Sequence, residues 1–243
     1  MKQEVLLLLG LSLGASGVSS LISIIQKATV PGGLTKTVTL NPTYAPGQPW
    51  IDFAYHLYDV VFGVMAALMA WHLLARDHRD VPKLLGIDVT RPRLDLLTGA
   101  GLAALIGIPG LGLYWAARML GVNATIQAEA LPKVWWGIPM LVLAAIQNAI
   151  NEEVVVVGYL TTRLQQIGLR IVPIIALSAA LRGSYHLYQG VGGFIGNFVM
   201  GVIFAFVYRW WGRVLPLIIA HSILDIASFV GYDLLVNHWS FLR

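Results

Sequence analysis

The sequence predicts an all-α protein, a polytopic membrane helix bundle of about seven transmembrane helices with its N-terminus in the cytoplasm. Three observations carry this prediction. The 243 residues are 57% hydrophobic and only 12% charged, with a mean hydropathy of +0.73, a composition that water-soluble domains of this size rarely show. Apolar stretches of about 20 residues, the length that crosses roughly 30 Å of hydrocarbon, recur along the chain. Tryptophans and cations mark the ends of these stretches, as they do in membrane proteins.

The expected spans follow from these stretches in chain order. Two of them, 5–25 and 96–117, contain no charged residue, and 53–75 is apolar apart from Asp59 and two histidines. The apolar run of the first span is longer than the roughly 7 to 15 residues of a signal-peptide core, so we expect a retained helix. The Thr-, Pro- and Gly-rich segment 30–50 predicts an irregular outer loop. Four further spans are expected at 134–161, 171–189, 192–211 and 214–236.

Interfacial residues support this set of spans and orient it. All eight tryptophans fall near span ends: Trp50, Trp71, Trp115, Trp135, Trp136, Trp210, Trp211 and Trp239. The second, fourth and sixth loops hold Arg76, Arg79, Lys83, Arg91, Arg93, Arg163, Arg170, Arg209 and Arg213, whereas Lys27, Lys36 and Lys133 lie in the opposite loops. The positive-inside rule then places the N-terminus in the cytoplasm and the C-terminus outside. The cations behind the net charge of +4 therefore lie in the loops and set the orientation of the chain in the membrane. We expect no nucleic-acid partner.

The absence of cysteine restricts the chemistry that the chain can perform. It excludes a disulfide scaffold, a thiolate zinc site and a cysteine nucleophile. No HExxH motif is present, which argues against a zincin mechanism. The run 190–201 places Gly192 and Gly196 at GxxxG spacing, which is typical of close helix packing and would serve either internal packing or a dimer.

Ionisable residues at membrane depth are concentrated in the last four spans: Glu152, Glu153, Arg182, His186, His221 and Asp225. A charged side chain at the bilayer centre costs about 2.5 to 3.5 kcal/mol on insertion scales, so such groups face the bundle interior and mark functional sites. A purely structural ion-pair network is the alternative. Because the group spans three helices and combines carboxylates with imidazoles, it suits the activation of water, directly or through a metal.

Helical spacing groups these residues by face. Arg182 and His186 are four residues apart, as are His221 and Asp225, so each pair shares one face of its helix. Glu152 and Glu153 point about 100° apart and cannot have the same role.

In this order, EEVVVVGY (152–159), RGSYHLYQG (182–190) and HSILD (221–225) resemble the motifs of the CPBP (Abi) family of intramembrane proteases, which includes the type II CaaX prenyl endopeptidases. The resemblance covers roughly 150–230. It implies that Glu152 activates water with His221 as its partner, and that Glu153 supports them. It implies that His186 and Asp225 stabilise the oxyanion or bind a metal.

Two positions depart from the family pattern. Val157 occupies the usual arginine position, and Arg182 occupies the usual phenylalanine position four residues before His186. We expect Arg182 to reach the glutamate pair from the neighbouring helix and to replace the missing cation. An ionised Asp225 cannot donate to an oxyanion, so we expect it to orient His221. The alternative is one divalent metal such as zinc, with Glu152, His186, His221 and Asp225 as the candidate ligands.

The resemblance thus implies one integral membrane domain, 1–243, in which 1–130 carries three accessory spans and 131–237 forms a four-helix catalytic core. The expected function is an intramembrane endopeptidase acting on a membrane-bound peptide or protein substrate, in contact with membrane lipid, in a cell membrane such as the bacterial cytoplasmic membrane. Two alternatives stay open. One is a noncatalytic scaffold or immunity protein of the same fold that binds a membrane partner or lipid. The other is an ion-coupled transporter, which the short chain and the lack of repeated halves disfavour.

Overall fold

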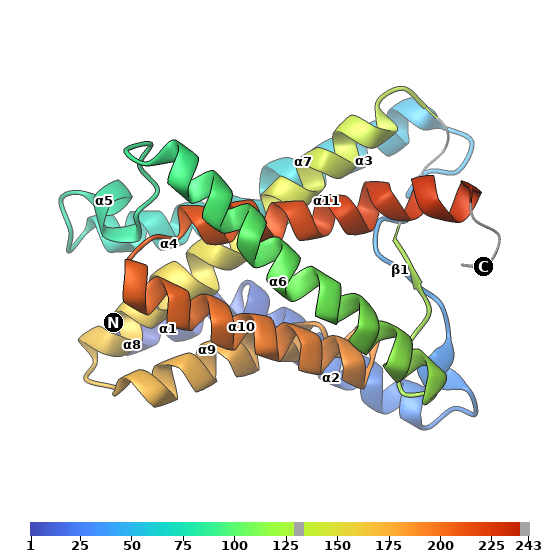
Figure 1. The fold of residues 1–243 in the computed structure, drawn as a ribbon, viewed down its shortest axis with the longest axis horizontal. Coiled ribbons are helices and arrows are strands. Elements are labelled where there is room, and N and C mark those ends of the chain that lie inside the picture. Colours follow the sequence, from blue (N-terminus) through green and yellow to red (C-terminus); the bar gives the residue numbers. More distant parts are fainter. Residues whose placement is uncertain (129–133, 239–243) are drawn as a thin grey trace.

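The computed structural model describes residues 1–128 and 134–238 and confirms an almost entirely α-helical protein (Figure 1). Lys133 and Trp239, which entered the prediction of topology, lie outside the described residues. The described part of the chain contains two strands, β1 (Val38–Thr39) and β2 (Ile126–Gln127), which pair in parallel.

The first span is a broken helix. It consists of α1 (Lys2–Gly10) and α2 (Leu13–Ala28), which meet at an angle of 52°. The second span is made of α3 (Pro49–Gly63) and α4 (Met65–Ala75). A proline in the first turn starts α3, where its missing N–H costs no hydrogen bond.

A short helix, α5 (Val81–Leu85), precedes the third span, α6 (Pro92–Met119). The Asp80 side chain caps α5 by accepting a hydrogen bond from the Lys83 backbone N–H. The predicted third span therefore corresponds to one long helix.

The remaining helices carry the predicted ionisable cluster. The fourth span comprises α7 (Gly137–Glu152), the π-helix η2 (Glu153–Tyr159) and α8 (Leu160–Gln166). It is followed by three helices and one 3-10 turn: α9 (Ile171–Tyr185), η3 (Leu187–Gln189), α10 (Val191–Trp211) and α11 (Leu215–His238).

Helix length and composition support a multi-pass membrane protein. In the described residues, four helices are long and apolar enough to cross a membrane, and the bent pair α1–α2 makes a fifth candidate. Two shorter apolar helices, Ile171–Tyr185 and Leu215–Gly231, occupy the places of the fifth and seventh predicted spans. Each predicted span thus has a helical counterpart, while the count of seven and the orientation stay predictions.

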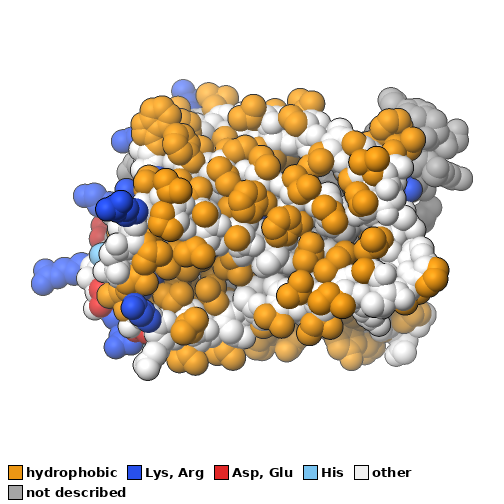
Figure 2. All heavy atoms as spheres, turned by 90° about the horizontal axis from the view of Figure 1, so that it is seen from below, with side chains coloured by type: hydrophobic (Ala, Val, Ile, Leu, Met, Phe, Trp, Pro, Cys, Tyr) orange, Lys and Arg blue, Asp and Glu red, His pale blue; other side chains and the backbone are white. Residues whose placement is uncertain are grey.

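The surface of the bundle is consistent with this placement. Figure 2 shows hydrophobic side chains over most of the length of one face and Lys and Arg side chains gathered at one end. Leu97 and Ile108 of α6, exposed by 71% and 72%, are examples of such outward apolar side chains. The N-terminus and the connections α4–α5, α8–α9 and α10–α11 lie at that same end (Figure 1).

Packing within the bundle gathers the later helices around one interior. In this interior α9 packs against α10, and α11 packs against both α6 and α7. Gly192 lets α10 approach α6 closely, since a Cβ at this position would lie 2.6 Å from the Cβ of Ala117. Gly196 faces Leu113 of α6. The GxxxG pair therefore serves packing inside the bundle.

The outer loop is partly ordered by β1 and by the 3-10 turn η1 (Gly33–Thr35), where the sequence predicted only irregular structure. Its later part is held by Asp52 of α3, which is fully buried and whose Oδ1 accepts hydrogen bonds from the backbone N–H groups of Tyr44 and Ala45. Leu40 and Asn41, earlier in the same loop, lie beside the cavity described next, and the Asn41 side chain donates a hydrogen bond to the Ala128 carbonyl.

Candidate active site

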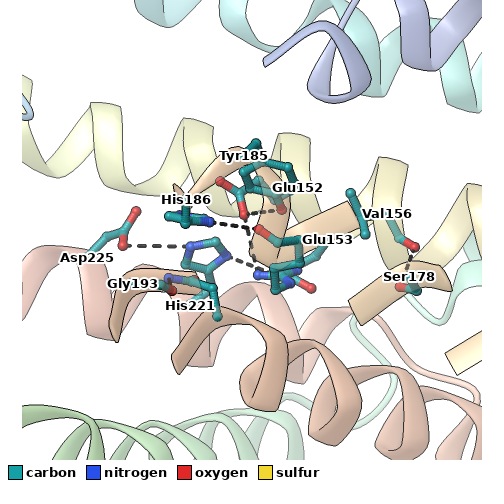
Figure 3. A network of polar contacts seen from close by, with 11 residues as sticks. Glu152, Glu153, Val156, Ser178, Tyr185, His186, Gly193, His221 and Asp225 are labelled. Carbon is teal, nitrogen blue, oxygen red and sulfur yellow. Dashed lines mark hydrogen bonds and ion pairs between the residues drawn. The ribbon is translucent and has the colours of Figure 1, made fainter. Parts of the chain in front are cut away.

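Glu152, His186, His221 and Asp225 border a single cavity of about 750 Å³. They come from the end of α7, the residue after α9, and α11, three segments that lie far apart in the sequence. Figure 3 shows their side chains directed toward one another. The structure therefore brings the predicted residues together.

A π-helix begins immediately after Glu152, which the sequence analysis did not predict. The segment η2 contains four consecutive valines and Gly158, residues that form α-helices less readily than Ala or Leu. Its seven residues are all buried. π-helical turns are rare and occur frequently at functional sites.

Hydroxyl groups satisfy the carbonyls of this π-helix. Ser178 of α9, which is fully buried, donates to the Val156 carbonyl over 2.9 Å (Figure 3). Thr161 and Thr162 donate to the carbonyls of Val157 and Gly158 over 2.5 and 2.7 Å. These bonds stabilise the irregular backbone that presents the two glutamates.

Among residues 1–128 and 134–238, only one carboxylate oxygen of Glu152, Oε2, is held by other side chains, and the other oxygen, Oε1, is free on a side chain that lines the cavity. Its Oε2 accepts hydrogen bonds from the Tyr185 hydroxyl at 2.7 Å and from the Arg182 guanidinium at 3.3 Å. The described residues provide no hydrogen-bond partner for Oε1, although Glu152 is only 9% exposed and lines the cavity. A water or substrate group in the cavity can therefore reach Oε1.

Glu153 is fully buried and does not line the cavity. Its Oε1 accepts hydrogen bonds from Arg182 at 2.6 Å and from Nδ1 of His221 at 2.7 Å. His221 was expected to be the partner of Glu152, but its hydrogen bond goes to Glu153. Adjacent helical residues point in different directions, and in this structure the carboxylate of Glu153 is the one that contacts His221 of α11.

Arg182 links both glutamates from the neighbouring helix, which confirms the expected geometry. The guanidinium is fully buried, and its Cζ lies 5.4 Å from the ring centroid of Phe204. Val157 is also fully buried, within the apolar core. The positive charge beside the glutamate pair is thus supplied by α9, in place of the usual arginine position in η2.

The two histidines are each held through Nδ1. His221 donates to Glu153, and its Nε2 lies 3.6 Å from Oδ1 of Asp225, an ion-pair distance longer than a hydrogen bond. His186 makes a 3.1 Å contact from Nδ1 to the Arg182 carbonyl, which can only accept, so Nδ1 carries the proton. Nε2 of His186 remains for other partners, whereas Nε2 of His221 faces Asp225.

Comparison with known families agrees with this arrangement. Residues 134–227 match the family model described as Type II CAAX prenyl endopeptidase Rce1-like. The matched region, here called the Rce1-like domain, covers less than half of the chain. The domain contains all six ionisable residues of the cluster, which confirms the resemblance to the CPBP family. Neither the comparison with curated proteins nor the comparison with solved structures gives a significant match.

The cavity extends beyond the Rce1-like domain. Residues of α2 form part of its wall, and Leu40 and Asn41 of the outer loop form another part. Ser20 of α2 donates to the Tyr185 carbonyl over 3.0 Å, and Lys27 donates to the Tyr188 carbonyl over 2.5 Å. The first span, expected as accessory, therefore holds the end of α9 and encloses the site.

Whether Glu152, His186, His221 and Asp225 bind a metal ion stays a prediction. Among the described residues, no group of three or more His, Asp or Glu side chains is arranged to hold one. Arg182 and Tyr185 already occupy Oε2 of Glu152, and Glu153 occupies one nitrogen of His221. The proposed chemistry below is therefore derived without a metal.

Two residues of the site were not singled out from the sequence. Tyr185, which is 5% exposed, donates to Glu152 and lies next to His186. Asn148, one helical turn before Glu152, lines the same cavity as Asp225. The spacing of Asn148 and Glu152 was a usable signal, since residues four apart on a helix share a face.

Proposed function

We propose that this chain is an intramembrane endopeptidase that hydrolyses a peptide bond at or within the bilayer, with Glu152 as the general base. The observation that carries the proposal is the free Oε1 of Glu152, which faces the cavity while Oε2 is held by Tyr185 and Arg182. A carboxylate fixed in this way can take a proton from a water molecule in the cavity. The Rce1-like family supports peptidase activity.

His221 is the proposed proton donor. Both of its ring nitrogens face carboxylates, Glu153 at 2.7 Å and Asp225 at 3.6 Å, a setting that suits the imidazolium with a proton on each nitrogen. The imidazolium at the cavity wall can stabilise the oxyanion and protonate the leaving nitrogen. Glu153 and Asp225 act as positioning residues for the ring.

The proposed reaction returns every group to its starting state. Glu152 takes a proton from water while the water oxygen adds to the scissile carbonyl carbon. The carbon–nitrogen bond then breaks as the nitrogen receives a proton from His221, and the proton held by Glu152 returns to His221. The products are a carboxylic acid and an amine.

Two neutral or weakly charged groups complete the proposed site. The Asn148 amide lines the same cavity as Asp225 and can donate a hydrogen bond to the oxyanion, which an ionised Asp225 cannot do. His186 lines the same cavity with Nδ1 held by the Arg182 carbonyl, so that Nε2 is available to water or substrate.

The experiment that tests this proposal compares membranes containing the wild-type chain with membranes containing Glu152→Gln. We expect membrane peptides that are absent or scarce with the wild type to accumulate with the variant, and we expect Glu4→Gln to behave as the wild type. The alternative function, a noncatalytic scaffold binding a membrane partner or lipid, predicts identical peptide profiles for all three proteins. That result would overturn the proposed hydrolysis.

A further inference from the structure

Apart from its ionisable residues, the lining of this cavity is unusually rich in hydroxyl and amide groups for a membrane segment. Helix α2 contributes four serines to the lining: Ser16, Ser19, Ser20 and Ser23. Three other elements contribute amides to the same cavity, namely Asn41, Asn148 and Gln189. Ligand pockets are usually lined mainly by apolar side chains, so this composition indicates a polar ligand.

Helix packing does not explain these serines. The face of α2 that packs against α9 uses Gly17, where a Cβ would lie 2.6 Å from Oγ of Ser184, and Ser20, which donates to the Tyr185 carbonyl. In the described part of the chain, the Ser16, Ser19 and Ser23 hydroxyls have no hydrogen-bond partner, and all three border the cavity. Polar groups at membrane depth are expensive unless they meet water or a polar ligand.

A second observation in the same cavity points to a ligand. Oε1 of Glu152, on a side chain that is nine-tenths buried, faces this space without a partner among the described residues. The serine wall and the catalytic carboxylate thus border one volume. A molecule that contacts one of them can contact the other.

An extended polypeptide backbone fits this lining. Each of its residues presents one N–H donor and one C=O acceptor, which must be satisfied inside a membrane. Serine hydroxyls and carboxamides can both donate and accept, so they can serve either group. The small serine side chains also leave space for the side chains of the substrate.

The same lining is poorly suited to a prenyl chain. Burying an isoprenoid is favourable only where its carbons contact apolar surface. The aliphatic and phenylalanine members of the lining are few and come from α2, the outer loop and α11: Leu13, Ala15, Leu40 and Phe229. Leu40 and Phe229 belong to one small apolar cluster, whereas Leu13 and Ala15 lie on α2 together with the four serines.

We infer that the substrate is an unprenylated polypeptide segment that binds in extended form against the serines of α2 and the neighbouring amides, in the cavity that Glu152 also lines. This inference rests on the proposed peptidase function and names the class of its substrate. It also assigns substrate recognition to a span outside the Rce1-like domain.

The test uses two pools of decapeptides incubated with the purified full-length chain in liposomes. The pools have the same sequences, each with one cysteine, and differ only in that this cysteine is S-farnesylated or S-methylated. Mass spectrometry identifies the cleaved peptides, and Glu152→Gln protein serves as the blank. We expect cleavage of the methylated pool at a rate at least equal to that of the farnesylated pool.

Cleavage confined to the farnesylated pool would overturn the inference and leave the proposed function intact. Cleavage of neither pool would contradict the proposed function, and this inference with it. The two failures are therefore distinguishable.

A pair of neighbouring substitutions tests the wall itself. Ser19→Leu removes a hydroxyl from the wall, whereas Val18→Leu enlarges a side chain that is 61% exposed and does not line the cavity. For the best-cleaved methylated peptide, we expect Ser19→Leu to raise KM about tenfold with kcat within about twofold, and Val18→Leu to leave both unchanged. Ser16→Leu provides a second wall variant. Unchanged KM in both wall variants, with wild-type unfolding temperatures, would overturn the assignment of the wall.

Discussion

The guanidinium of Arg182 donates a 2.6 Å hydrogen bond to Glu153 from the neighbouring helix, in a site where both side chains are fully buried. The same guanidinium reaches Glu152 at 3.3 Å. One cation therefore neutralises two adjacent carboxylates that would otherwise repel each other inside the membrane.

Removal of this cation is expected to destabilise the fold. Arg182→Leu leaves two buried carboxylates uncompensated, so we expect a loss of about 3 to 5 kcal/mol in the free energy of unfolding. Chemical unfolding in detergent measures it, with Arg76→Leu as the control, since the Arg76 side chain is 63% exposed. If Arg182→Leu left both stability and activity unchanged, the compensating role of Arg182 would be wrong.

Arginine at position 157 should partly replace Arg182. In the double variant Val157→Arg with Arg182→Leu, a cation returns to the same neighbourhood from η2, so we expect part of the lost stability to return. If the double variant and Arg182→Leu had equal stabilities, an arginine at position 157 would not supply the cation that Arg182 provides to the glutamates.

The π-helix depends on Ser178. In Ser178→Ala the buried Val156 carbonyl loses its donor, so we expect a loss of about 1 to 3 kcal/mol. Ser184→Ala is the control, because Ser184 bonds a carbonyl of its own helix and is only partly buried. Similar unfolding curves for Ser178→Ala and the wild type would show that the hydroxyl does not stabilise η2.

Tyr185 should affect turnover more than binding. Tyr185→Phe keeps the ring but removes the donor that fixes Oε2 of Glu152, so we expect kcat to fall about tenfold with KM within about twofold. Tyr55→Phe, on the exposed face of α3, should match the wild type. An increase in KM at constant kcat would instead assign Tyr185 to substrate binding.

Acid stability should depend on Asp88, which lies in the connection before α6. Hydrogen bonds from the Thr90 hydroxyl and backbone N–H, and then from Arg213, lower the pKa of Asp88 from 3.8 to about 2. Because the folded pKa is the lower one, Asp88 stabilises the fold above about pH 4, and this contribution is lost as the pH falls toward about 2. We expect the unfolding temperature of Asp88→Asn to fall less than that of the wild type across this interval. An equal fall in both proteins would contradict the assignment.

Spacing within single helices predicted much of the site. The pairs Arg182/His186 and His221/Asp225 and the different directions of Glu152 and Glu153 follow from helical geometry alone. These features are local, so one sequence is sufficient to predict them. The reach of Arg182 to the glutamates is a contact between helices, and it was expected only because the resembled family has an arginine at the position of Val157 and a phenylalanine at the position of Arg182.

Features that depend on how helices rotate against one another were not predictable in this way. The partner of His221 is Glu153 because of the rotation of α11 relative to the end of α7. The π-helix arises where four valines meet a buried donor, Ser178, from another helix. The serines of α2 line the cavity because Ser20 and Gly17 pack that helix against α9, and this packing could not be predicted from the sequence.

The central claim is that Glu152 is the general base of a peptidase. Its most direct test is the rate at which purified Glu152→Gln protein in liposomes cleaves a peptide that the wild type cleaves, with the unfolding temperature measured on the same sample. The account predicts wild-type folding and a loss of kcat of at least about a hundredfold, the size expected for general acid–base catalysis. Wild-type kcat in a correctly folded Glu152→Gln protein would contradict the account.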